Sequence, residues 1–92
     1  MIPASELDLN TTYKDPVGAY ALYRRMIRET AGTDVVIPHN LGFVPKQAFV
    51  VSSEGKAMSC FFKVTNGAVV KDTLKITLRF SDTNAIVTVR IQ

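Results

Sequence analysis

The stretch that decides the fold is Val35-Val36-Ile37-Pro38-His39-Asn40-Leu41-Gly42-Phe43-Val44-Pro45-Lys46. A β-branched run, typical of a strand, stops at one proline, and a second proline precedes the next apolar run. The segment between the prolines predicts a rigid corner that joins two strands. Glycine at position 42 suits a positive φ angle or a close backbone approach. The residues that we interpret as structural in this corner are Pro38, His39, Leu41, Gly42 and Pro45.

Strand patterns continue after the corner. The runs that resemble strands span residues 47–51, 58–64, 68–70, 74–80 and 87–91. The last two alternate apolar and polar side chains, which is typical of antiparallel strands with one solvated face. Asn66-Gly67 is a strong signal for a tight hairpin turn. About five strands at this spacing predict a mainly β fold, either a small antiparallel β-sandwich or a partly open barrel.

The N-terminal third has a different pattern, in which residues 1–14 lack periodicity and predict an extended arm. Asp15 can cap a helix, Pro16 fits a first helical position, and apolar residues recur at spacings of three and four as far as Ile27. We therefore predict a short helix over 15–31. A competing interpretation places strands at 22–29 and 34–38, joined by a hairpin turn.

Length and composition indicate one domain over residues 1–92, with the predicted sandwich occupying 33–92. The chain is 47% hydrophobic and 21% charged, as in ordinary globular proteins. Its net charge is +3, which allows nucleic-acid binding but does not imply it. Since small domains often gain stability by oligomerising, some of the apolar surface is expected to be buried against a partner.

No catalytic pattern is found in the sequence. His39 is the only histidine, and its neighbours in sequence include no second metal ligand and no nucleophile. We interpret it as a hydrogen-bonded turn residue that ties a strand end to a backbone carbonyl. Cys60 is the only cysteine, which excludes an intrachain disulfide and favours a small core residue. We expect a protein that is not an enzyme and has no metal or cofactor, with an activity built around His39 as the alternative.

Candidate contact residues lie in the N-terminal third. Three arginines with two nearby tyrosines form the densest basic cluster, and two leucines could anchor the arm. Arginine and tyrosine are favoured at protein interfaces, and an arginine cluster can also bind phosphate. The predicted interface residues are Leu7, Leu9, Tyr20, Tyr23, Arg24, Arg25 and Arg28. A protein partner is the first expectation, and a small nucleic-acid-binding β domain is the alternative.

No membrane segment or export signal is visible. The first residues contain neither a basic start nor an apolar run, and no apolar stretch approaches the roughly 20 residues that span a bilayer. We expect synthesis in the cytoplasm without a signal peptide, and no membrane partner.

The corner resembles a recurring pattern in tailed-bacteriophage virion proteins, in which a β-branched strand enters His-x-Leu-Gly and then a proline. The matching residues are His39, Leu41, Gly42 and Pro45, and the resemblance extends over about 33–92. It implies a β-sandwich of the tail-fibre, tail-accessory or head-decoration type. It also implies a symmetric homo-oligomer, often a trimer, that binds other virion proteins and has no active site. The short chain favours a decorating, capping or joining protein.

Overall fold

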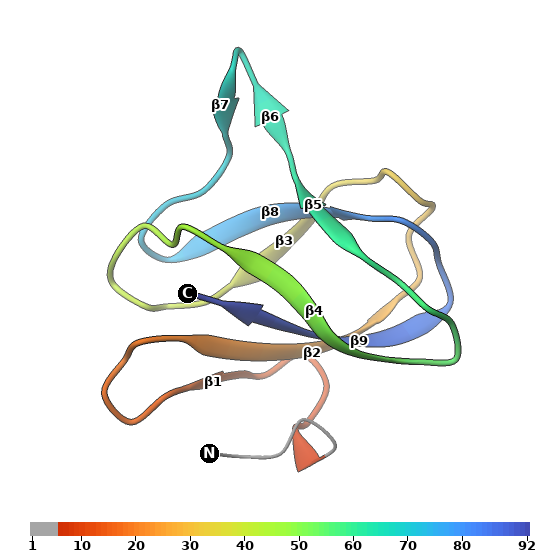
Figure 1. Ribbon diagram of the computed structural model, residues 1–92, viewed down its shortest axis with the longest axis horizontal. Coiled ribbons are helices and arrows are strands. Elements are labelled where there is room, and N and C mark those ends of the chain that lie inside the picture. Colours follow the sequence, from red (N-terminus) through yellow and green to blue (C-terminus); the bar gives the residue numbers. More distant parts are fainter. Residues whose placement is uncertain (1–5) are drawn as a thin grey trace.

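A computed structural model describes residues 6–92, which form nine strands. The strands are β1 (Thr12–Lys14), β2 (Ala21–Ile27), β3 (Val35–Pro38), β4 (Ala48–Glu54), β5 (Cys60–Phe62), β6 (Val64–Thr65), β7 (Ala68–Val69), β8 (Lys75–Phe80) and β9 (Ala85–Ile91). One sheet has the order β1-β2-β9-β4, a second has the order β3-β8-β5, and β6 and β7 form a separate hairpin (Figure 1). Neighbouring strands in each sheet run antiparallel. The fold is a small β-sandwich.

The core lies between the two larger sheets. The two strands nearest the carboxyl end, β8 and β9, have alternating apolar and polar residues and lie inside their sheets. β8 contributes a row of buried side chains to one layer, and β9 contributes a row to the other. β1, β2 and β4 complete the layer of β9, and β3 and β5 complete the layer of β8. The buried residues of this core are Tyr23, Ile27, Val35, Ile37, Ile76, Leu78, Phe80, Val87, Val89 and Ile91.

The predicted helix over 15–31 is wrong. Within residues 6–92 the structure contains no α-helix, and β2 occupies the centre of that segment. Asp15 and Pro16 instead begin a turn, in which the amide of Gly18 donates to the carbonyl of Asp15 at 2.8 Å. Asp at the first position, Pro at the second and Gly at the fourth also favour a β-turn. The same residues that resembled a helix cap therefore close the β1–β2 hairpin.

The competing interpretation of this segment was right about the strand and wrong about its partner. β2 pairs with β1 and β9, with Ala21 opposite Ile91 and Ile27 opposite Ala85. It does not form a hairpin with β3, because the turn over residues 30–33 carries the chain from one sheet to the other. β1 and β2, together with the β6–β7 hairpin, raise the number of strands above the five expected.

The described part of the predicted N-terminal arm belongs to the folded body. Leu7 is buried against Tyr20 and Leu22 on the outer face of the sheet that contains β2. The amide of Asn10 donates to the carbonyl of Arg24 at 2.7 Å, and residues 12–14 form β1. Residues 6–14 are therefore a strap and an edge strand on this chain's own sheet. Residues 1–5 of the predicted arm lie outside the described residues.

The β6–β7 hairpin projects from the sandwich (Figure 1). Its tip is Asn66-Gly67, with φ angles of 53° and 79°. Positive φ at both central residues is the conformation that a two-residue type I′ turn requires, so the hairpin signal in the sequence is confirmed. Thr65 pairs with Ala68, and Val64 pairs with Val69.

Candidate interaction sites

His39 is a buried tie at the corner. Its Nε2 lies 2.9 Å from the carbonyl oxygen of Asp72, and its Nδ1 accepts a hydrogen bond from the amide of Leu41 at 3.0 Å. Because Nδ1 accepts, Nε2 carries the proton and donates to Asp72. The imidazole has no exposed surface. The interpretation of His39 as a residue that ties a strand end to a backbone carbonyl is therefore confirmed.

Backbone hydrogen bonds complete the corner. The amides of His39 and Asn40 both donate to the carbonyl of Leu74, and the amide of Gly42 donates to Thr73, each at 2.9 Å. Gly42 has a φ of +84° with open space around its α-carbon, so it supplies a positive φ and not a close approach. The corner crosses from β3 in one sheet to β4 in the other.

The remaining corner residues also have structural positions. Pro38 is the last residue of β3 and is exposed, whereas Pro45 is fully buried. Leu41 is partly buried and packs against the main core. These positions agree with the interpretation of the corner residues as structural.

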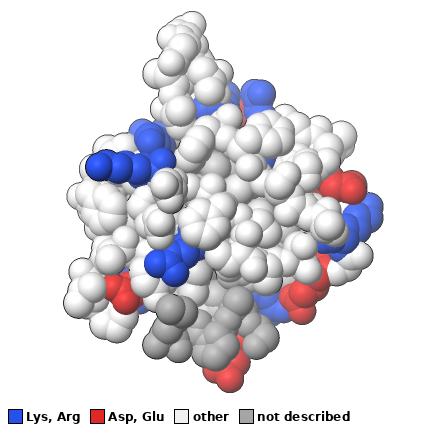
Figure 2. All heavy atoms as spheres, viewed as in Figure 1, with Lys and Arg blue, Asp and Glu red and all other residues white. Residues whose placement is uncertain are grey.

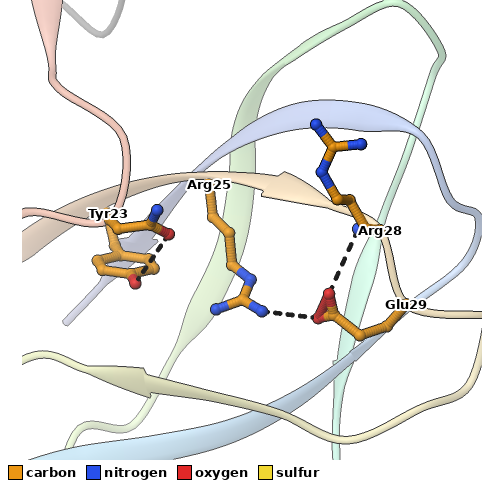
Figure 3. A network of polar contacts seen from close by, with 5 residues as sticks. Tyr23, Arg25, Arg28 and Glu29 are labelled. Carbon is orange, nitrogen blue, oxygen red and sulfur yellow. Dashed lines mark hydrogen bonds and ion pairs between the residues drawn. The ribbon is translucent and has the colours of Figure 1, made fainter.

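The predicted arginine cluster does not exist as one surface. Successive residues of a strand point to opposite faces, so Arg24 and Arg25 diverge along β2. Arg24 forms an ion pair with Glu54 of β4. Arg25 forms an ion pair with Glu29 at 2.9 Å, and Figure 3 shows the guanidinium of Arg28 pointing away from that pair. A phosphate-binding patch made of these three arginines is therefore not formed.

Most of the other predicted interface residues are part of the core. Leu7, Tyr20 and Tyr23 are all buried within this chain, with exposed fractions of 1%, 9% and 4%. Their side chains are not available to a partner, since they already pack against the strap or between the sheets. Leu9 and Arg28 remain exposed. These residues were predicted as contacts because they were expected on the exposed surface of a helix. They lie instead on or near a strand whose two faces are both covered by other parts of the chain.

The projecting hairpin was not among the predicted contact residues. From Val64 to Val70 it contains no charged residue, and it stands out as an uncharged projection in Figure 2. Val64 is 57% exposed. In the described part of the chain β6 and β7 pair only with each other, so their outer edges carry backbone groups without a strand partner. Composition alone could have indicated this site, because Val-Thr-Asn-Gly-Ala-Val-Val lies between Lys63 and Lys71.

Charged residues fix the base of the hairpin. Lys63 forms an ion pair with Asp34 at 2.5 Å, and Lys71 lies over the ring of Phe62 at 5.4 Å from its centroid. The amide of Val70 donates to the carbonyl of Lys63 at 3.0 Å. Lys63 and Arg79 of β8 both donate hydrogen bonds to the carboxylate of Asp34. These hydrogen bonds hold the pKa of Asp34 below its ordinary value. The hairpin therefore leaves the body from a fixed base.

Cys60 packs partly buried against the main core, where burial raises the pKa of its thiol. A protonated, partly buried thiol is a poor nucleophile, which agrees with a packing role.

Among residues 6–92 no group of three His, Cys, Asp or Glu side chains could hold a metal ion. Over the same residues, no helix is long and apolar enough to cross a membrane.

Comparison with protein-family models, with curated proteins and with solved structures finds no match to this chain.

Proposed function

We propose that this protein is a non-enzymatic structural protein of a bacteriophage virion, which acts by binding copies of itself and neighbouring virion proteins. The observation that carries the binding role is the projecting, uncharged β6–β7 hairpin with two free edges. An exposed apolar side chain such as that of Val64 is unfavourable in water, and its burial by a partner is favourable. Strand edges add backbone hydrogen bonds to such contacts.

Further exposed apolar side chains support the same role. Large hydrophobic residues remain at the corner, on the edge strand β4 and on β5, in addition to the hairpin. These residues are Phe43, Val44, Phe49, Val51 and Phe61, each between 40% and 49% exposed. Separate patches of this kind suit a subunit with several neighbours, since weak contacts made together hold a protein firmly on a lattice.

The virion assignment rests on the resemblance of the corner residues His39, Leu41, Gly42 and Pro45 to phage virion proteins. In the structure these residues shape the crossover between the two sheets. Their position is consistent with a family trait that is architectural. Head decoration, head–tail joining and tail accessory roles are the candidates within this proposal.

Two measurements test the proposal. Native mass spectrometry of the full chain should show a closed homo-oligomer, with a trimer as the first expectation. Proteomic analysis of purified particles of the phage that encodes this chain should find it at many copies per particle. A strictly monomeric protein that is absent from purified particles would overturn the proposal.

A further inference from the structure

A small basic depression lies at the end of β9, close to the end of the corner. It has a volume of about 320 Å³ and is lined by Ala19, Tyr20, Lys46, Gln47, Arg90 and Gln92. Among the described residues, the side chains of the lining include two cations and no carboxylate, while the main-chain oxygen of Gln92 accepts from the amides of Lys46 and Gln47 at 2.8 and 2.9 Å. Ligand pockets run from roughly 300 to 1,000 Å³, so this one has room for a single side chain and not for a large cofactor.

Arg90 is held in place at the wall of this depression. Its guanidinium carbon lies 3.9 Å from the centroid of the Tyr20 ring, a close cation–π stack. Its Nε donates to the side-chain oxygen of Gln92 at 2.7 Å. The side-chain nitrogen of Gln92 donates in turn to Gln47 Oε1 at 3.1 Å. The guanidinium is therefore oriented before any ligand arrives, which lowers the entropy lost on binding.

Several hydrogen-bond donors of the lining have no partner among the described residues. Within residues 6–92, the two Nη groups of Arg90 and the Nζ of Lys46 form no hydrogen bond or ion pair. The side-chain nitrogen of Gln47 is likewise available. The paired Nη groups of an arginine match the two oxygens of a carboxylate, and a nearby lysine adds a second positive charge.

We infer that this depression binds a carboxylate, supplied by a glutamate or aspartate side chain of a partner protein. The surroundings favour a protein over a nucleic acid. Phe49 of β4 lies directly opposite Arg90 in the strand register and is 41% exposed, so an exposed aromatic residue is the neighbour of the arginine in the sheet. Arginine beside exposed aromatic residues is typical of protein interfaces. A nucleic acid would require a longer stripe of cations, and Arg24 and Arg25 are already paired with Glu54 and Glu29.

This inference is independent of the virion role, because it rests on the depression alone. The test is an NMR titration of the ¹⁵N-labelled full chain at pH 7 with N-acetylglutamate methylamide. The expected result is saturable shifts of the Arg90 Nε–H signal and of the Gln47 and Gln92 side-chain amides. The neutral N-acetylglutamine methylamide should bind at least fivefold more weakly.

Three variants and a titration with inorganic phosphate make the test more specific. Arg90→Gln and Lys46→Gln should each weaken binding of the glutamate probe at least fivefold. Arg28→Gln removes an exposed arginine elsewhere and should leave it unchanged. Tighter binding of inorganic phosphate than of the glutamate probe would overturn the carboxylate assignment. Shifts that do not saturate, or that are the same in Arg90→Gln, would overturn the site itself.

Discussion

His39 joins two segments that lie 33 positions apart in the chain. One ring nitrogen donates to Asp72 and the other accepts from Leu41, so the imidazole fastens the corner to the turn before β8. The buried histidine therefore contributes to stability and to the path of the chain between the two sheets.

Replacing His39 with alanine should lower the free energy of unfolding by about 3 kcal/mol, because it leaves a cavity and two polar groups without partners. His39→Asn is the matched comparison, since its shorter side chain can still accept from Leu41 but not reach Asp72. It should lose less stability than His39→Ala. Urea denaturation at pH 7 measures both, and an unchanged midpoint for His39→Ala would contradict the structural role.

Asp72 makes the same turn sensitive to acid. The amides of Leu74 and Lys75 both donate to its Oδ1 at 2.8 Å, and these hydrogen bonds hold the pKa of its carboxyl below the ordinary value. A group whose pKa is lower in the folded state stabilises the fold above its unfolded pKa. That stability is lost as the pH falls through the folded pKa.

The variant Asp72→Asn keeps an oxygen acceptor but removes the charge. It should be less stable than the wild type at pH 7, and the difference should shrink as the pH falls below about 4. Asp34 and Asp82, whose pKa values are also lowered, are present in both proteins and cancel in the comparison. Urea midpoints at pH 7, 5 and 3 test this. A difference that stays constant over this range would refute it.

At the scale of the element, the strap over residues 6–10 explains why β2 was mistaken for a helix. Tyr23 and Ile27 face the main core, while Leu22 faces outward beneath Leu7. A strand that is covered on both faces loses its alternation of polar and apolar residues. The covering segment lies about fifteen residues earlier in the chain, so no local pattern could have revealed it.

The strap makes a testable contribution to folding. Leu7→Ala should lower the free energy of unfolding by about 3 kcal/mol, because Leu7 is 1% exposed in a small cluster. Leu9→Ala is the matched control, since Leu9 is 42% exposed and should cost well under 1 kcal/mol. Thermal or urea unfolding of both variants gives the comparison. Equal stability of the Leu7 variant and the wild type would mean that the segment is a loose arm after all.

The Asn66-Gly67 turn could be predicted because its signal is local, whereas the Asp15–Gly18 turn was mistaken for a helix cap. All four asparagines of the chain have positive φ, at positions 10, 40, 66 and 84. The alternating runs at the carboxyl end also gave β8 and β9 correctly. The pairing of the strands could not be predicted from the sequence, since β9 lies between β2 and β4 and both are distant from it along the chain.

At the scale of the whole molecule, the error over β2 carried into the predicted interface. On a helix Arg24, Arg25 and Arg28 would lie near one another, but on a strand neighbouring residues alternate between faces. The structural role of the corner could be predicted, because it depends on residues close together in sequence. The uncharged hairpin could be recognised in the sequence, but its projection from the sandwich and the basic depression became visible only with the fold, since exposure and convergence are properties of the folded chain.

The molecule as a whole has two surfaces that could meet a partner, the uncharged hairpin and the basic depression. At the base of the hairpin, ion pairs such as that of Asp34 with Lys63 hold the side chains in place. Since a 92-residue chain buries a limited share of its surface, association is an effective way for it to gain stability. We therefore predict that a partner covers the hairpin in the working assembly.

Sedimentation equilibrium of three full-length proteins tests this claim most directly: the wild type, Val64→Lys and Val17→Lys. Val64 lies on the hairpin, whereas Val17 is an 86% exposed valine in the β1–β2 turn and gives a matched control. The wild type and Val17→Lys should associate equally, and Val64→Lys should associate at least tenfold more weakly with unchanged folding. Association of Val64→Lys as tight as that of the wild type, or a wild type that stays monomeric, would contradict the account.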